Sequence, residues 1–239
     1  MSIHQVNVAF AGLTAAGKMT HADMLATDLH YELVEAAPMI QRLLDIHDDG
    51  PAETWWIRNL AESERRREGD HVDDILETVL VDLASTKEGQ VFDTWALPWI
   101  YSGPMVRIYL RSDLPSRTRK AYVSQGPTPA LSLDQCTELI ASKDVSTRQR
   151  FLRRHQFDLY RDYSSFDAVL DNSTLIESPT REAADLGIAT FHPFVRALST
   201  LFMRDDPSGL IELNTRNPNQ FAVIVVRIAH RAFNYPEVA

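Results

Sequence analysis

Residues 12–20 of the chain read GLTAAGKMT, and most of the expected fold follows from them. Gly12 and Gly17 stand at the first and sixth positions, where a tightly curled backbone needs residues without a side chain. In such a loop successive N–H groups point inward and can surround phosphate oxygens. Lys18 follows directly and supplies a mobile cation that can move with a phosphoryl group. The stretch predicts a phosphate-binding loop.

The flanks of this loop predict a strand before it and a helix after it. Residues 6–11 form a short apolar run, which is typical of a buried central strand. From Thr20 the apolar residues Ala22, Leu25 and Leu29 recur at helical spacing. A helix that begins near Lys18 adds unpaired N–H groups and its positive dipole end to the phosphate site.

The remaining pattern alternates between short apolar runs and helical stretches. Further strands are expected at 31–36, 90–95, 106–111 and 166–171. Helices are expected within 37–88 and at 114–124, 131–143, 146–162 and 179–200. Strands that alternate with helices imply a parallel sheet covered on both faces, a three-layer α/β fold. Residues 210–214 and 221–228 are ambiguous, because they could form a hairpin or the second could be a helix.

Composition narrows the class of protein. The chain has 239 residues, 44% hydrophobic and 24% charged, with a net charge of −9. These values are globular and disfavour a nucleic-acid polymer as partner. Cys136 is the single cysteine, so no intramolecular disulfide can form. Residues 1–8 lack the pattern of a signal peptide, and the apolar stretch 221–226 is too short to span a bilayer. We expect a cytoplasmic protein that does not bind a membrane.

The loop also carries a family resemblance. The usual pattern places Ser or Thr directly after the lysine, whereas this chain has Met19 there and Thr20 one place later. With a hydroxyl residue two places after the lysine, this loop resembles that of nucleoside monophosphate kinases, which usually ends in Gly-Lys-Gly-Thr. Met19 takes the place of the glycine after the lysine in that pattern. The sequence therefore leaves open how magnesium and phosphate are arranged at this position.

Further segments resemble the cytidylate kinase-like branch of these P-loop enzymes. Lys143-Asp144 followed by Arg150-Phe151 is similar to that branch's Arg-Asp and Arg-Tyr pairs. Residues 166–173 resemble its closing strand and loop, and residues 110–120 resemble the start of its lid. The likeness covers about 190 residues of the chain, with the order of elements intact, and leaves residues from about 200 unmatched.

The resemblance implies a P-loop kinase domain over 1–200, with a parallel five-stranded sheet. It further implies acceptor-binding helices at about 37–88 and a lid at about 114–160, and we expect residues 201–239 to pack on the same domain as an extension. The implied substrates are ATP with Mg²⁺ and a small acceptor such as CMP; a homodimer is left open.

The residues expected to bind ATP are Gly12, Thr14, Ala15, Ala16, Gly17, Lys18, Met19, Thr20, Asn172 and Ser173. The residues expected to act in transfer are Lys18, Asp93, Arg117, Arg148 and Arg150, and Thr20 and Asp93 are expected to serve Mg²⁺.

The spacing of the arginines near residue 150 independently suggests a role in phosphoryl transfer, although it also fits a solvent-exposed helix face. Arg150, Arg153 and Arg154 lie at i, i+3 and i+4, so they share one helix face. Such cations could stabilise a migrating phosphoryl group, whose charge spreads over several oxygens. A solvated basic face on a surface helix would have the same pattern.

The acceptor side departs from the branch. Its third strand ends in Glu-Gly-Arg, and the arginine holds the acceptor phosphate; here the same place reads Asp93-Thr94-Trp95. We therefore consider Arg42, Arg58 and Trp95 as acceptor-binding residues. A tryptophan could stack on a flat ring, although packing in the core explains it equally well. Two alternatives stay open: a kinase of a modified nucleoside or a non-nucleotide metabolite, and a catalytically weak nucleotide-binding regulator, which Met19 would fit.

Overall fold

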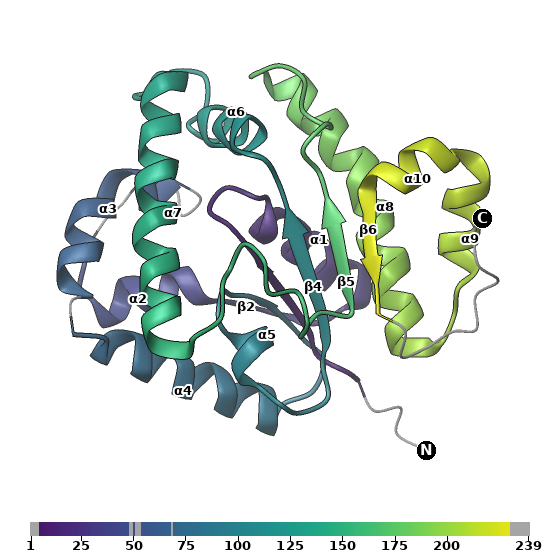
Figure 1. Ribbon diagram of the computed structural model, residues 1–239, viewed down its shortest axis with the longest axis horizontal. Coiled ribbons are helices and arrows are strands. Elements are labelled where there is room, and N and C mark those ends of the chain that lie inside the picture. Colours follow the sequence, from purple (N-terminus) through teal and green to yellow (C-terminus); the bar gives the residue numbers. More distant parts are fainter. Residues whose placement is uncertain (1–4, 48–49, 51–53, 68, 230–239) are drawn as a thin grey trace.

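The computed structural model describes residues 5–47, 50, 54–67 and 69–229, and its centre is a six-stranded sheet (Figure 1). The strands are β1 (Val8–Gly12), β2 (Glu32–Glu35), β3 (Gln90–Asp93), β4 (Val106–Arg111), β5 (Ala168–Asp171) and β6 (Val225–Ile228). Their order in the sheet is β2-β3-β1-β4-β5-β6. The first five are parallel and β6 is antiparallel to β5. The fold is α/β with a mostly parallel central sheet.

Strand β1 is buried throughout because helices cover both faces of the sheet. Val8 and Phe10 pack on one face, in a cluster with α1 (Lys18–Leu29) and α8 (Arg181–Arg204). Ala9 packs on the other face, in a cluster with α4 (His71–Thr86) and α5 (Leu97–Ile100). The near-continuous apolar run of β1 is what a parallel strand between two helical layers requires.

The remaining helices lie at the carboxyl ends of the strands or beyond the sheet edge. Helices α2 (Ala36–Leu43) and α3 (Trp55–Arg66) come between β2 and α4. Helices α6 (Leu114–Ser124) and α7 (Leu133–His155) follow β4, and Figure 1 shows α6 above the carboxyl ends of the central strands. Residues 48–49, 51–53 and 68, within the expected acceptor-binding helices, lie outside the described residues.

The structure corrects two expectations about the elements. Helix α7 is continuous from Leu133 to His155, where two helices, at 131–143 and 146–162, were expected. No glycine or proline interrupts it, and Ser132 begins it with a capping box to Gln135. Its end comes at Gln156, which adopts a left-handed conformation.

The sheet has six strands rather than five, because the end of the chain adds β6. Residues 210–214 form no strand and belong to helix α9 (Ser208–Arg216). Helix α10 (Pro218–Ile224) follows, and β6 then pairs with β5. Leu210 and Ile224 are buried in the same cluster as β1 and α8, so this segment packs on the same core as the parallel strands. Residues 230–239 of the expected extension lie outside the described residues.

Among the described residues, only α8 is long and apolar enough to cross a membrane. Half of its most apolar window is buried inside the fold. Phe191, Phe194, Val195 and Leu198 of this helix face the sheet in the cluster around β1. The apolar character of α8 is therefore explained by its place in the core.

Candidate active site

The loop between β1 and α1 has a conformation that its glycines make possible. Gly12 has φ +152°, and a Cβ there would lie 2.4 Å from the Leu110 carbonyl oxygen. Gly17, with φ +92°, precedes the first residue of α1, and Ala15 has φ +59°. Positive φ angles at separate positions turn the backbone around a concave space. The first N–H groups of α1 precede its first complete turn and therefore have no acceptor within the helix.

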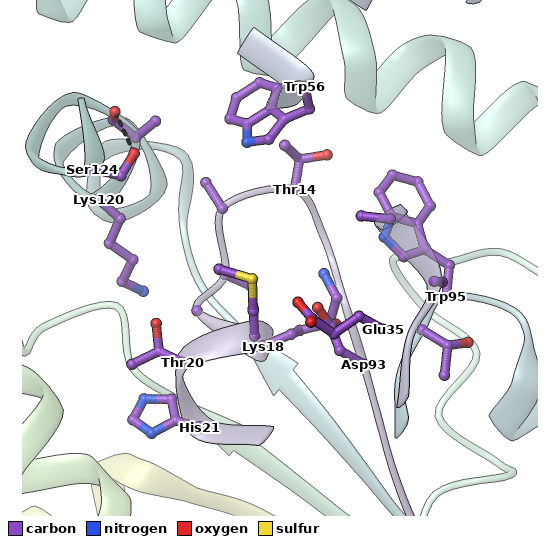
Figure 2. A pocket seen from close by; sticks show the side chains of 18 of the residues that line it. Thr14, Lys18, Thr20, His21, Glu35, Trp56, Asp93, Trp95, Lys120 and Ser124 are labelled. Carbon is purple, nitrogen blue, oxygen red and sulfur yellow. Dashed lines mark hydrogen bonds between the residues drawn. The ribbon is translucent and has the colours of Figure 1, made fainter. Parts of the chain in front are cut away.

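The loop forms the floor of a cavity of about 740 Å³ (Figure 2). We call one side of it the α6 half; it is lined by α6, α8 and the loop after β5, including Lys120, Ser124, Asn172 and Arg181. The other side is the α4 half; it is lined by β2, the helices α2, α3, α4 and α7, and the residues after β3, including Glu35, Trp55, Asp73, Trp95 and Lys143. One cavity therefore offers two compartments that meet at the loop.

Lys18 and Asp93 meet where the two halves join. Figure 2 shows the Lys18 ammonium beside the Asp93 carboxylate. Burial lowers the pKa of Lys18, and the charge of Asp93 partly opposes this shift. Burial raises the pKa of Asp93, and Lys18 partly opposes that shift in turn. The Lys18 Nζ also donates to the Leu13 carbonyl oxygen at 3.2 Å, so the lysine folds back over its own loop.

In the α6 half, Lys120 and Asn172 form a polar wall against the loop. The Asn172 Nδ2 donates to the Ala16 carbonyl at 2.9 Å, and the Lys120 Nζ donates to the Ser112 Oγ at 2.9 Å and to the Asn172 Oδ1. Burial, followed by the charge of Arg117, lowers the pKa of Lys120 to about 7. Lys120 thus lies next to the phosphate-binding loop and loses its proton near neutral pH.

We expect the binding of ADP above pH 7 to take up a proton through Lys120. The free protein loses the Lys120 proton as the pH rises through about 7. A bound polyanion favours the ammonium form, so binding restores the proton, about one at most, and affinity falls as the pH rises. Calorimetry at pH 8 in buffers of different ionisation enthalpy measures this uptake. Lys120→Met should abolish it and Lys143→Met should keep it; an unchanged uptake in Lys120→Met contradicts the assignment.

The α4 half has an aromatic wall with two cations against it. Lys18 Nζ lies 5.6 Å and Lys143 Nζ 5.7 Å from the centre of the Trp95 ring. Lys143 Nζ is also 5.1 Å from the Trp56 ring, and these distances are those of cation–π contacts. Burial, followed by the charge of Arg67, lowers the pKa of Lys143 to about 7. Trp95 is thus within cation–π distance of both the loop lysine and a lysine from α7.

The cavity fits a nucleotide phosphate chain and a hard divalent cation. Thr14 is 4% exposed and its Oγ1 has no hydrogen-bond partner among the described residues. The Asp93 Oδ1 is buried and likewise without a partner in the described part of the chain. A carboxylate oxygen without a partner beside a phosphate loop is a suitable ligand for Mg²⁺ or one of its waters. In Figure 2 Thr20 lies next to His21 and Lys120, apart from Asp93.

The expected lid arginines are held in ion pairs. Arg117 is 4% exposed, contacts Asp144 at 2.7 Å and donates to the Thr14 carbonyl at 3.3 Å. It therefore braces the loop from behind and does not line the cavity. Arg148 donates to the Asp158 carboxylate at 3.0 Å and stacks over Tyr160. Arg148 does not line the cavity either.

Arg150 joins α7 to the helices of the α4 half. Its guanidinium lies 2.6 Å from Glu64 and 3.5 Å from Asp73, and its side chain is 9% exposed. Arg154, one turn away, lies 2.9 Å from Asp74 and 2.8 Å from Glu77. Arg150 and Arg154 are thus neither solvated nor turned to the loop, because they pack on the acids of α3 and α4, whereas Arg153 on the same face stays largely exposed.

We expect Arg150→Ala to destabilise the protein by about 1.5–3 kcal/mol, because Glu64 loses its charged hydrogen-bond partner and the buried carboxylate of Asp73 keeps, among the described residues, only its ion pair with Arg67. Arg153→Ala on the same helix is the control. The Arg153 side chain is 61% exposed and pairs with Asp70, so its loss should cost less than about 1 kcal/mol. Urea denaturation of both variants measures the free energy of unfolding. Equal, small losses would contradict the bracing role of Arg150.

The structure gathers only part of the residue set expected from the sequence. The loop residues from Thr14 to Thr20, with Asp93, Trp95 and Asn172, line the cavity. Ser173 instead accepts from the Asp113 N–H and bonds to Asp171, and Gly12 supports the loop from below. The structure does not bring Arg42 or Arg58 to the cavity; Arg42 is exposed on α2, and Arg58 donates to the Thr54 Oγ1 at 2.6 Å.

Three cavity residues were not singled out by the sequence. Lys143 entered the sequence analysis only as part of a family motif. A lysine within the expected lid is itself a candidate for binding phosphate. Glu35 ends β2 just as Asp93 ends β3, so the same signal, an acid at a strand's carboxyl end, applied to it. His21 gave no signal, because nothing in its spacing places it against His192, 3.5 Å away on α8.

Residues 7–174 match the model of the cytidylate kinase-like family. The chain belongs to this family. The match begins just before β1, includes the loop, the α4 half of the cavity and α7, and ends just after β5. The segment with α8, α9, α10 and β6 lies outside it.

No curated protein matches the sequence. Among solved structures, a shikimate kinase from Bacteroides thetaiotaomicron has 14% identity and a TM-score of 0.49, covering 80% of this chain and 98% of its own. A gluconokinase from Sinorhizobium meliloti 1021 has 12% identity and a TM-score of 0.45, covering 90% and 97%. Similarities at this level do not identify an acceptor.

Proposed function

We propose that this protein transfers a phosphoryl group from Mg²⁺-ATP to a small acceptor that carries a flat ring. The observation that supports this most is the meeting of Lys18 and Asp93 on the floor of a two-sided cavity, directly above the loop. Membership of the cytidylate kinase-like family agrees with it. The partners that this activity needs are small molecules.

In this proposal the loop and the α6 half hold the nucleotide. The N–H groups of the loop, Lys18 and Lys120 bind the phosphate chain, and Asp93 serves the metal's coordination sphere. The Thr20 hydroxyl, expected at the metal from the sequence, lies beside Lys120 and in this proposal contacts the phosphate chain instead. Mg²⁺ held beside Asp93 would supply positive charge that offsets the negative charge of the phosphate oxygens. The chain's own contribution is to position these groups and to present cations where charge develops during transfer. Arg117 acts indirectly, because it fixes Thr14 of the loop.

The family favours a nucleoside monophosphate such as CMP as the acceptor, and the α4 half favours a second candidate. Trp95 stands where the family has an arginine for the acceptor phosphate. An arginine can grip a phosphate with two parallel N–H bonds, whereas an indole has one donor and no charge. Trp95 and Trp56 instead offer flat surfaces for a ring. A nucleoside or another ring compound without that phosphate is therefore the second candidate.

The test is an ADP-release assay of the purified protein with Mg²⁺-ATP and a panel of acceptors. The panel pairs nucleosides with their monophosphates and includes ring-containing metabolites. We expect at least one acceptor to raise ADP release well above the rate without acceptor. If the protein binds Mg²⁺-ATP but no acceptor raises the rate, the result favours a nucleotide-binding regulator. If it binds no Mg²⁺-ATP, the proposed function is wrong.

A further inference from the structure

The α4 half is poor in cations that could hold an acceptor phosphate. The acids that line it are Glu35, Asp73, Glu77 and Asp93, and its cations apart from Lys18 are Arg67 and Lys143. Arg67 is itself bound to Asp73, with 11% of its side chain exposed. Arg150 forms ion pairs with Glu64 and Asp73. Asp73 and Glu77 are in turn paired with arginines, Asp73 with Arg67 and Arg150 and Glu77 with Arg154. A doubly charged phosphate entering this half would therefore meet the carboxylates of Glu35 and Asp93, with Lys18 and Lys143 as the cations that Asp73 does not hold.

Glu35 is the acid best placed to take part in transfer. It is the last residue of β2, and its Cα pairs in register with that of Asp93 on β3. Helix α2 begins at the next residue, so the backbone of Glu35 is fixed between a strand and a helix. Figure 2 shows the Glu35 carboxylate directed at the same point as Asp93 and Lys18. It approaches that point from the α4 half.

The neighbours of Glu35 suit an uncharged body. Ala36, Ala37 and Ile40 continue the wall from Glu35, and Trp55 closes it from α3. Trp55 is 7% exposed, and its Nε1 has no hydrogen-bond partner among the described residues. A buried N–H without a partner is costly unless a ligand accepts from it. This half therefore presents apolar surface and a neutral donor in addition to its acids.

We propose that the acceptor presents an alcohol hydroxyl rather than a phosphate, and that Glu35 accepts the proton of that hydroxyl. This inference rests on the proposed kinase function. In the step, the hydroxyl oxygen forms a bond to the γ-phosphorus of ATP. The bond from that phosphorus to its bridging oxygen breaks, and ADP leaves. The hydroxyl proton passes to the Glu35 carboxylate and from there to solvent.

The need for a base distinguishes the two acceptor classes. A phosphate acceptor attacks through an oxygen that is already ionised at neutral pH, so it needs no carboxylate beside it. An alcohol keeps its proton until attack, and a positioned base typically speeds such a step by about 10²–10⁴-fold. Asp93 is a weaker candidate for this role, because it is buried against Lys18 and faces the expected metal position.

Water can replace the alcohol, so the role of Glu35 can be tested before the acceptor is identified. We expect Glu35→Gln to lower the slow hydrolysis of Mg²⁺-ATP by about 10²-fold or more. Its affinity for ADP should stay within a few-fold of the wild type. Glu32→Gln is the matched control, since Glu32 lies on the same strand with an exposed side chain that pairs with Lys87.

The acceptor class is tested by binding. Calorimetry compares cytidine with CMP on protein saturated with ADP, and we expect that CMP does not bind more tightly than cytidine. CMP binding at least tenfold tighter than cytidine would overturn the inference, and so would unchanged ATP hydrolysis in Glu35→Gln. Either result leaves the proposed kinase function in place. A wild-type protein that binds no Mg²⁺-ATP would instead overturn that function and this inference with it.

Discussion

The variant Lys18→Met is expected to lose phosphoryl transfer by about 10³-fold or more while remaining folded. Methionine keeps the length and much of the volume of the buried lysine, so the packing under the loop survives. What disappears is a cation positioned where charge develops during transfer, and such groups act mainly on the transition state. Single-turnover ADP formation with Mg²⁺-ATP, in the presence or absence of acceptor, measures the loss.

Two further measurements separate this role from a structural one. ADP should still bind, because the loop N–H groups and Lys120 remain, and the thermal midpoint should change little. Lys87→Met, at an exposed lysine that pairs with Glu32, serves as control and should be fully active. An active Lys18→Met protein would contradict the assignment of residues 12–20 as the phosphate loop of an enzyme.

The loop and the central strands were predictable from the sequence for local reasons. Gly12 and Gly17 mark positions where the backbone has positive φ, and the apolar run before them has the pattern of a strand between two layers. The strand expected at 106–111 has the bounds of β4, and the helix expected at 114–124 has those of α6. In each of these cases the deciding signal lies within a few residues of the feature.

The contacts around the α4 half could not be predicted, because they join segments far apart in the chain. Arg150 pairs with Glu64 across 86 positions, and nothing in the basic pattern of α7 separates this pairing from a solvated face or a phosphate contact. Glu35 comes beside Asp93 only because β3 is inserted between β2 and β1 in the sheet. Strand β6 likewise depends on an open edge at β5, which no local signal reveals.

The second large effect is expected for Asp93→Asn, a change that keeps shape and removes one negative charge. If Asp93 serves the magnesium sphere, transfer should fall by about 10²-fold or more, and no concentration of Mg²⁺ should restore it fully. The amide also removes the charge that opposes the lowering of the Lys18 pKa, so the Lys18 pKa should fall further. The variant protein should therefore bind phosphate progressively less well as the pH rises.

Binding of ADP with and without Mg²⁺ isolates the metal contribution from the charge of Lys18. In the wild type Mg²⁺ should strengthen ADP binding, and in Asp93→Asn this gain should be largely lost. Metal-free ADP should bind about equally to both at a pH low enough to keep Lys18 charged in the variant. Asp23→Asn is the comparison, because Asp23 lines the same cavity one turn along α1 but is exposed, whereas Asp93 is buried against Lys18. It should keep the full gain. A carboxylate that binds the metal cannot be replaced by an amide without weakening the metal site. A full Mg²⁺ gain in Asp93→Asn as well would therefore mean that Asp93 does not bind the metal and that its charge acts on the ammonium of Lys18 alone.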